Sequence, residues 1–180
     1  MKTERYDRQI ILEGFGEEAQ SLLSTARVLV VGAGGLGCPI LQYLVAAGIG
    51  HIGIADNDTI ALSNLQRQIL FSTADVGKLK TVVAAERLQE MNPEIESKPH
   101  TLRLQKSNIL DLLKMYDLII DGTDNFDSRY LINDACTLLK KPLIFAAVSG
   151  YEGQLAIFNV QDDQGKATNY RDIFPIPPQA

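Results

Sequence analysis

The stretch Arg27-Val-Leu-Val-Val-Gly-Ala-Gly-Gly-Leu-Gly37 is typical of an apolar strand that ends in a glycine-rich turn. Gly32, Gly34 and Gly37 match the pattern G-x-G-x-x-G. In that pattern the first glycine permits a tight turn, the second lets the backbone approach a phosphate, and the third lets the next helix pack closely. Pro39 suits the first turn of that helix, whose free N–H groups favour an anion. We therefore predict a nucleotide-phosphate site at this turn.

An acidic residue at a suitable distance supports this prediction. Asp56 lies nineteen positions beyond Gly37 and follows a second apolar segment, 51–55. In dinucleotide-binding folds an acid at such a distance bonds the ribose hydroxyls. The alternative is a glycine turn that serves only packing, but that alternative leaves the strand, the helix and the acid unexplained.

The rest of the chain alternates between strand and helix patterns. We expect strands at 27–31, 51–55, 95–104, 117–121 and 143–148, and helices at 38–47, 78–91, 108–114 and 125–140, with 56–75 irregular. This order predicts an α/β fold with a Rossmann-like, mostly parallel sheet and helices on both faces. The segment 154–160 follows a short turn and predicts an antiparallel strand near the C-terminus.

We expect one domain over residues 1–180, with a helical arm over 1–26 and an irregular, proline-containing tail over 161–180 that lacks core-forming periodicity. The formal net charge of -5, without a basic run, argues against nucleic acid as a partner. The absence of a long apolar run argues against a membrane and predicts a cytoplasmic protein. Cys38 and Cys136 lie in apolar helical patterns, so we expect buried small hydrophobes rather than reactive thiols.

Three charged residues outside the glycine turn have two interpretations each. Arg67 is either a solvated surface charge or a ligand-binding cation in a polar insertion. Lys80 opens a helix, where a cation is unfavourable unless a phosphate lies nearby. Asp124 follows a strand at the carboxyl edge of the sheet, where open α/β folds bind ligands, but an acid there also suits a helix cap.

Several motifs together resemble the MoeB/ThiF family (HesA/MoeB/ThiF), relatives of the adenylation domain of ubiquitin-activating enzymes. The resemblance runs from Arg5 to about Pro178. The motifs are Arg5-Tyr-Asp-Arg-Gln9, Gly32-Ala-Gly-Gly-Leu-Gly-Cys38, Asp56 with Asp58, Ser63-Asn-Leu-Gln-Arg-Gln68, Val76-Gly-Lys-Leu-Lys80, Thr123-Asp-Asn125 and Glu152-Gly-Gln154.

The resemblance implies a sulfur-carrier protein adenylyltransferase, a nucleotidyltransferase that uses ATP and magnesium. Its partner would be a ubiquitin-like sulfur-carrier protein ending in Gly-Gly, in thiamine or molybdenum-cofactor (molybdopterin) synthesis, and the enzyme would be a homodimer. The residues that the family pattern implies for the nucleotide are Gly32, Gly34, Gly35, Gly37, Asp56, Asn64, Arg67, Gln68 and Lys80. Arg67, Lys80, Asp124 and Arg8 would be catalytic, with magnesium on Asp124 and with Arg8 reaching the γ-phosphate of the neighbouring subunit.

Two departures from the family pattern matter. Asn169-Tyr-Arg-Asp172 stands where many relatives have Cys-x-x-Cys, so zinc is not expected. The sequence also stops soon after Phe174, whereas relatives continue, which implies a C-terminal truncation.

Neither His51 nor His100 is expected in the chemistry, because a carboxylate nucleophile is already ionised at neutral pH. The rival functions are an NAD-dependent oxidoreductase and a non-catalytic carrier-binding partner of the same fold.

Overall fold

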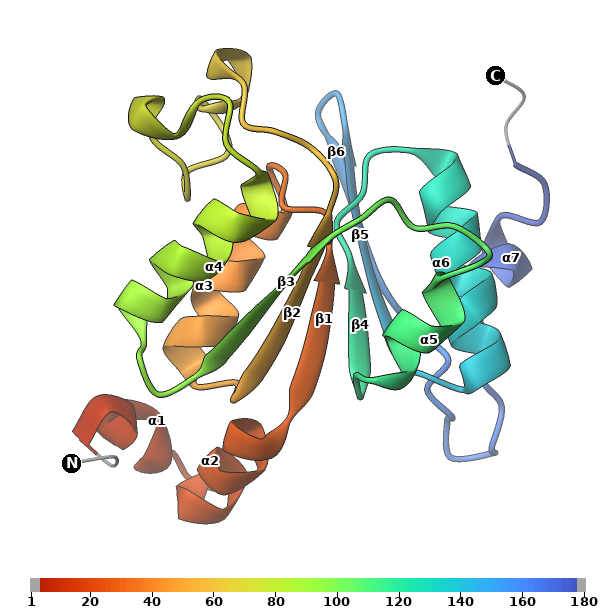
Figure 1. Cartoon of the computed structure of the whole chain (residues 1–180). Helices are drawn as coiled ribbons and strands as arrows, with labels where there is room; N and C mark the ends of the chain where they lie inside the picture. The colour runs from red at the N-terminus through yellow and green to blue at the C-terminus, as the bar shows by residue number, and fades with distance from the viewer. Residues whose placement is uncertain (1–3, 178–180) are drawn as a thin grey trace.

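A single twisted sheet organises the chain, in a computed structural model that describes residues 4–177. The first three residues of the predicted arm and the last three of the predicted tail therefore lie outside the described residues. The strands are β1 (Arg27–Val31), β2 (His51–Asp56), β3 (Glu96–Thr101), β4 (Leu118–Asp121), β5 (Leu143–Ser149) and β6 (Glu152–Phe158). Their order is β3-β2-β1-β4-β5-β6, as Figure 1 shows. Neighbours pair in parallel except β5 and β6, which are antiparallel, so the predicted fold class is confirmed.

Helices cover both faces of this sheet (Figure 1). The helices α3 (Gly37–Ala47) and α4 (Lys80–Met91) pack on one side, and α5 (Ile109–Lys114) and α6 (Phe126–Leu139) pack on the other. Because both faces of β1 are covered, its side chains from Val28 to Val31 are all buried. The expected helix α4 begins two residues later than predicted, and β3 ends at Thr101 rather than 104.

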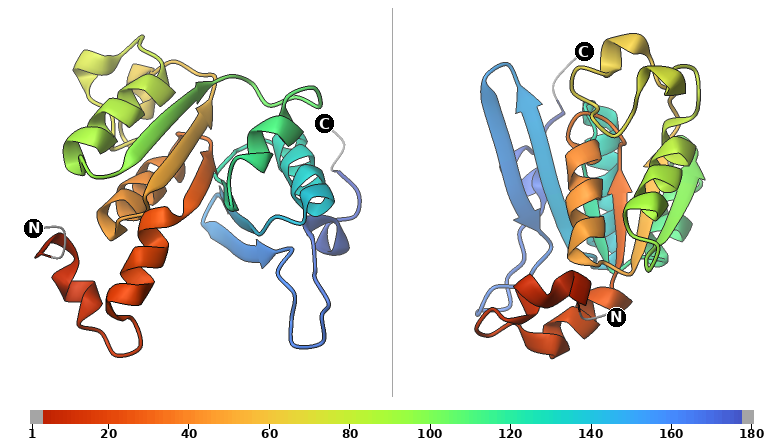
Figure 2. Two further views of the ribbon diagram at one scale, coloured as in Figure 1. Left: turned by 60° about the horizontal axis from the view of Figure 1, so that its bottom comes forward. Right: turned by 90° about the vertical axis from the view of Figure 1, so that its left-hand side faces the viewer.

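The N-terminal arm lies at the amino-terminal edge of the sheet, as Figures 1 and 2 show. It consists of the 3-10 helix η1 (Glu4–Tyr6), α1 (Asp7–Ile10) and α2 (Gly16–Thr25). The fully buried amide of Asn92 donates to the Tyr6 hydroxyl at 2.8 Å and to the carbonyl of Val45 at 3.0 Å. Gln9 donates to the carbonyl of Ala47 at 2.9 Å. These contacts fix the arm on the end of the sheet away from the carboxyl ends of the strands.

The tail differs from its prediction, because part of it is ordered and buried. Residues Tyr170–Ile173 form the helix α7, and Tyr170 is only 3 % exposed. Its ring lies 5.0 Å from that of Phe145 and 5.2 Å from that of Tyr130, between centroids. One aromatic residue in a polar segment shows no periodicity, which is why the sequence pattern missed this anchor.

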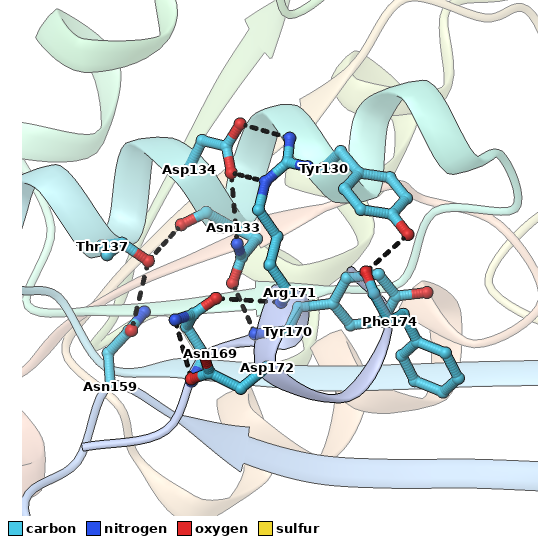
Figure 3. Close-up of polar contacts among 10 residues, drawn as sticks. All are labelled: Tyr130, Asn133, Asp134, Thr137, Asn159, Asn169, Tyr170, Arg171, Asp172 and Phe174. Atoms are coloured by element: carbon cyan, nitrogen blue, oxygen red, sulfur yellow. Dashed lines mark hydrogen bonds and ion pairs between the residues drawn. The ribbon is translucent and has the colours of Figure 1, made fainter. Parts of the chain in front are cut away.

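Polar contacts hold α7 in place from both ends (Figure 3). Asn169 caps the helix by accepting from the N–H of Arg171 at 2.9 Å, and Asp172 accepts from the N–H of Asn169 at 2.8 Å. Arg171 then makes a two-pronged ion pair with Asp134 of α6, at 2.6 and 2.8 Å. This pair lowers the pKa of the Asp134 carboxyl. Asn169 and Asp172 thus serve as a helix cap.

Neither cysteine is accessible. Cys38 and Cys136 are both 0 % exposed, and burial raises the pKa of their thiols to about 11 and about 12 respectively. The prediction of buried small hydrophobes is confirmed. Within residues 4–177, no helix has the length and apolar character that a membrane crossing requires.

Candidate functional site

A cavity of about 760 Å³ opens at the carboxyl ends of β1, β2 and β4. In the sheet, β2 and β3 lie on one side of β1, and β4, β5 and β6 lie on the other. The strand order therefore reverses at β1, and open α/β folds bind ligands at such a switch point. The predicted site residues that line the cavity are Gly32, Gly34, Gly35, Asp56, Asn64, Arg67, Gln68, Lys80 and Asp124. Gly37 lies just behind the wall, and Arg8 is elsewhere.

The glycine turn is as tight as its sequence pattern predicts. Gly32 has a φ of +92°, which favours glycine. A Cβ atom on Gly37 would lie 1.8 Å from the carbonyl oxygen of Gly32, so no other residue fits there without moving backbone. The first turn of α3 therefore lies directly against the end of β1, with Gly34 and Gly35 exposed to the cavity. This arrangement places a helix N-terminus where an anion binds favourably.

Asp56 does more than the sequence pattern indicates. One oxygen of its carboxylate accepts from the N–H of Ala33 at 2.8 Å, and the other accepts from the N–H of Asp58 at 2.8 Å. The side chain thereby joins the end of β2 to the glycine turn after β1. Since an ionised carboxylate offers about four acceptor positions, both oxygens can still accept from a ribose.

The long connection between β2 and α4 brings three predicted residues to the cavity. The carbonyl of Asn64 accepts from the N–H groups of Arg67 and Gln68 at 3.1 and 3.0 Å, so all three share one turn. Gln68 is 3 % exposed, and its side-chain oxygen has no partner in the described residues. The stem of Arg67 passes within 3.3 Å of the position that a Cβ on Gly35 would take.

Lys80 is a buried cation with a partner that its sequence position does not reveal. Its side chain is 6 % exposed, and its ammonium lies 2.8 Å from a carboxylate oxygen of Asp58. The Lys80 N–H also donates to the carbonyl of Asp58 at 3.1 Å. Asp58 is 62 % exposed and lines the cavity, so the charge of Lys80 is balanced by an acid at the surface of the site.

A second acid anchors the same connection. Asp75, in the 3-10 helix η3 (Thr73–Asp75), accepts from the Ser72 hydroxyl at 2.7 Å and from Lys78 and Arg87 at 3.1 and 3.2 Å. Hydrogen bonds from Ser72 and then from Lys78 hold the pKa of this carboxyl well below its usual range. Because Arg87 belongs to α4, Asp75 ties the connection to that helix.

The turn after β4 places Asp124 in the cavity without a capping role. Asn125 is the residue that caps α6, because its side chain accepts from the N–H of Ser128 at 2.9 Å. Asp124 is exposed and makes no hydrogen bond or ion pair with another of the residues 4–177. The capping alternative for Asp124 was therefore wrong.

Buried Asp121 shapes this turn from below. One of its oxygens accepts from the N–H and the hydroxyl of Thr123, at 2.9 and 2.7 Å. The other oxygen is buried without a partner in the described part of the chain. Burial raises the pKa of this carboxyl to about 6.

Sequence reasoning missed Arg129, which also lines the cavity. It lies in the first turns of α6, four positions after the capping Asn125, and one guanidinium nitrogen donates to the carbonyl of Thr123 at 3.3 Å. A basic residue within a helix has no sequence signal that separates it from a surface charge. Arg103, in the irregular connection between β3 and α5, also lines the cavity and was missed.

The cavity is suited to a polyphosphate. Arg67, Lys80, Arg103 and Arg129 bring cations from separate parts of the chain, against the carboxylates of Asp56, Asp58 and Asp124. Neither His51 nor His100 lines it: His51 contacts Glu96, and His100 contacts the Tyr116 hydroxyl. The residues 4–177 contain no group of three or more His, Cys, Asp or Glu side chains that could hold a metal alone.

The fold and this site define an α/β domain with a ligand-sized cavity at the carboxyl edge of its sheet, and comparison with known proteins assigns its family. The ThiF family model matches residues 6–180, so the chain belongs to the ThiF family.

One relative and two solved structures are similar to this chain. The chain is 49 % identical over 176 residues to the sulfur carrier protein adenylyltransferase of Thermus thermophilus, which covers 97 % of the chain and 65 % of that protein. A crystal structure of E. coli MccB with AMPCPP and selenomethionine MccA superposes with a TM-score of 0.75 and 32 % identity, over 82 % of this chain and 44 % of that one.

The second structure is E. coli tRNA N6-threonylcarbamoyladenosine dehydratase, TcdA, in complex with ATP. It gives a TM-score of 0.78 and 29 % identity, over 83 % of this chain and 61 % of that one. The chain thus spans less than two thirds of the length of the Thermus relative and of both solved structures.

Proposed function

We propose that the protein is an ATP-dependent adenylyltransferase that activates the C-terminal Gly-Gly carboxylate of a ubiquitin-like sulfur-carrier protein, of the kind serving thiamine or molybdenum-cofactor synthesis. The observation that carries this proposal is the gathering of the glycine turn, Asp56, Arg67, Lys80 and Asp124 around one cavity. The identity of 49 % to a sulfur carrier protein adenylyltransferase, against 29 % to the dehydratase TcdA, favours a carrier as the acyl substrate.

In the proposed reaction, a carboxylate oxygen of the terminal glycine attacks the α-phosphorus of ATP. The bond from that phosphorus to the bridging oxygen of the β-phosphate breaks, pyrophosphate leaves with the electron pair, and an acyl-adenylate forms. Two anions must approach each other, so the site has to neutralise charge and align the reactants. Arg67 and Lys80 supply that charge, and nucleotide phosphates compete with Asp58 for the Lys80 ammonium.

Nucleotide and metal both suit the residues present. The ribose would bond Asp56, and the phosphates would lie over Gly34 and Gly35 near Gln68, whose buried oxygen lacks a partner. Asp124 fits a magnesium ion, because its exposed carboxylate is unengaged within residues 4–177 and Mg²⁺ is commonly held by one or two carboxylates plus substrate phosphates. Magnesium would neutralise charge on the phosphates when bound.

The test is direct detection of the adenylated carrier. The protein is incubated with Mg-ATP and the Thermus thermophilus sulfur-carrier protein, quenched in acid, and the carrier is weighed intact by mass spectrometry. We expect the mass of an added AMP and release of pyrophosphate. A carrier with a C-terminal carboxamide should remain unmodified, because it has no nucleophilic carboxylate.

A pair of lysine variants tests whether the buried cation, rather than any lysine, is needed. Lys80→Ala removes the buried cation of the cavity and should abolish adenylation, whereas Lys98→Ala removes an exposed lysine of β3 and should leave it intact. Absence of the adenylated carrier with wild-type protein would overturn the proposal. Stabilisation of the chain by NAD as large as that by ATP would instead favour an oxidoreductase.

A further inference from the structure

Arg129 packs against two aromatic rings and forms no ion pair within residues 4–177, although its charge is close enough to buried Asp121 to oppose the rise that burial causes in the pKa of that carboxyl. Its guanidinium carbon lies 5.1 Å from the centre of the Phe126 ring and 5.4 Å from that of Phe145. One terminal nitrogen donates to the carbonyl of Thr123, while the buried Nε has no partner in the described residues. Arg87 and Arg171, in contrast, pair with Asp75 and Asp134. Within residues 4–177, no carboxylate forms an ion pair with Arg129.

Arg129 also stands between two cavities. The second cavity, of about 590 Å³, lies between the β5–β6 hairpin, α6 and the segment around α7. Arg129 and Val148 line both this cavity and the nucleotide cavity. A ligand that fills the second cavity and reaches the first must therefore pass beside the guanidinium.

The second cavity has the character of a binding site for a polypeptide. Its lining contains the exposed apolar side chains of Phe126, Val148, Ile173, Phe174 and Ile176. Ser149, Glu152 and Gln154 add polar groups along the hairpin. Apolar surface with a few polar groups is typical of a ligand-binding cavity.

We propose that Arg129 binds the carboxylate of the incoming acyl substrate and holds it at the junction of the two cavities, with the preceding residues of that polypeptide in the second cavity. This inference rests on the proposed adenylation function. A guanidinium offers a planar fork that matches a carboxylate, and here the fork is fixed by two aromatic rings and one carbonyl.

Arg129 would remain bound through the reaction. One carboxylate oxygen becomes the bridge to the phosphorus, and the other stays as the acyl carbonyl oxygen, still able to accept from the guanidinium. The competing explanation is that Arg129 only positions Thr123 and hence Asp124. The two explanations predict different ligand selectivity, because only the first gives Arg129 a contact with the acyl group.

The test compares ATP with 5′-O-[N-(glycylglycyl)sulfamoyl]adenosine, a stable analogue of the acyl-adenylate, by titration calorimetry. In Arg129→Gln the affinity for the analogue should fall roughly tenfold or more, as expected for loss of a charge-assisted hydrogen bond, while ATP binding changes less than about twofold. Arg129→Lys keeps the charge without the fork and should retain part of the lost affinity. In the control Arg103→Gln, which removes a cation lining only the nucleotide cavity, ATP should lose at least as much affinity as the analogue.

Three results would overturn the assignment. Equal losses for both compounds in Arg129→Gln and Arg129→Lys would show a purely positioning role, and unchanged binding of both would show no role. If wild-type protein binds neither compound, the adenylation function fails and this inference fails with it. If the wild-type protein binds both compounds and Arg129→Gln leaves the ratio of the two affinities unchanged, only the assignment of Arg129 is wrong.

Discussion

Asp56 shows how one side chain serves the fold and the ligand together. Its carboxylate accepts from two backbone donors, Ala33 N–H and Asp58 N–H, and the first of these bonds holds the glycine turn against the end of β2. Asp56→Ala leaves the N–H of buried Ala33 without a partner, which costs about 1–3 kcal/mol. We expect that loss in urea unfolding, accompanied by weaker ATP binding in calorimetry. If Asp56→Ala lost ATP binding but kept its stability, Asp56 would serve only to bind the ribose.

Asp124 and Asn125 are adjacent but should fail in different ways. Asp124→Ala should suppress ATP–pyrophosphate exchange far more than ATP binding, because the proposed contact of Asp124 with magnesium would matter mainly in the transition state. Its unfolding free energy should stay near that of wild type, since Asp124 has no structural partner in residues 4–177. Asn125→Ala removes the cap of α6 and should cost about 0.5–2 kcal/mol in the same unfolding assay. Comparable destabilisation by both variants would contradict these separate roles.

At the scale of elements, the connection between β2 and α4 depends on Asp75. Its folded pKa is lowered, so its stabilising effect is present above the unfolded pKa of about 3.9 and is lost as the pH falls below that value. Asp75→Asn should therefore lower stability at pH 7 and flatten the acid limb of the unfolding free energy. The measurement is a urea unfolding series between neutral pH and pH 2. An acid limb identical to that of wild type would contradict this.

The segment around α7 should hold its place without metal. Its anchors are the Asn169–Asp172 cap, the buried Tyr170 and the Arg171–Asp134 pair (Figure 3). We therefore expect EDTA to leave thermal unfolding unchanged, and elemental analysis to show no stoichiometric zinc. One zinc per chain would disprove this.

Tyr170→Ala should lower the free energy of unfolding by about 3–5 kcal/mol, in the range for loss of a buried aromatic side chain.

The sequence predicted what depends on local patterns and missed what depends on distant pairs. The path from β1 through the glycine turn to α3 follows from consecutive residues, and the structure has it as expected. The Lys80–Asp58 pair joins positions 22 apart, which no periodicity reveals. Strand β3 ends at Thr101 because its partner β2 ends at Asp56, a limit that the sequence of β3 does not contain.

At the scale of the whole molecule, Arg8 cannot reach its own cavity. It lies in α1 at the amino-terminal edge of the sheet, whereas the cavity lies at the carboxyl edge (Figure 1). A role in catalysis therefore requires a second copy of the chain, with Arg8 delivered in trans as arginine fingers are. Mixing Arg8→Ala with Asp124→Ala chains should restore about half of the wild-type activity per mixed dimer, since one site then carries both defects and the other none.

The control for this mixing experiment is verified subunit exchange, followed by native mass spectrometry of differently labelled chains. Each variant alone should be inactive. Mixed dimers that form without recovered activity would show that Arg8 acts in its own subunit or not at all. The position of α1, far from the cavity of the same chain (Figure 1), disfavours the first of these two explanations.

The proposed activity is transfer of AMP from ATP, bound in the cavity, to the carboxylate of a carrier. ATP–pyrophosphate exchange measures this step directly, because labelled pyrophosphate enters ATP only when the adenylate forms and reverses. We predict exchange with Mg-ATP and the Thermus thermophilus sulfur-carrier protein, and none when the carrier is omitted or lacks its terminal glycine. Exchange that is equally fast without a carrier, or no exchange with an intact carrier, would contradict carrier adenylation by this protein.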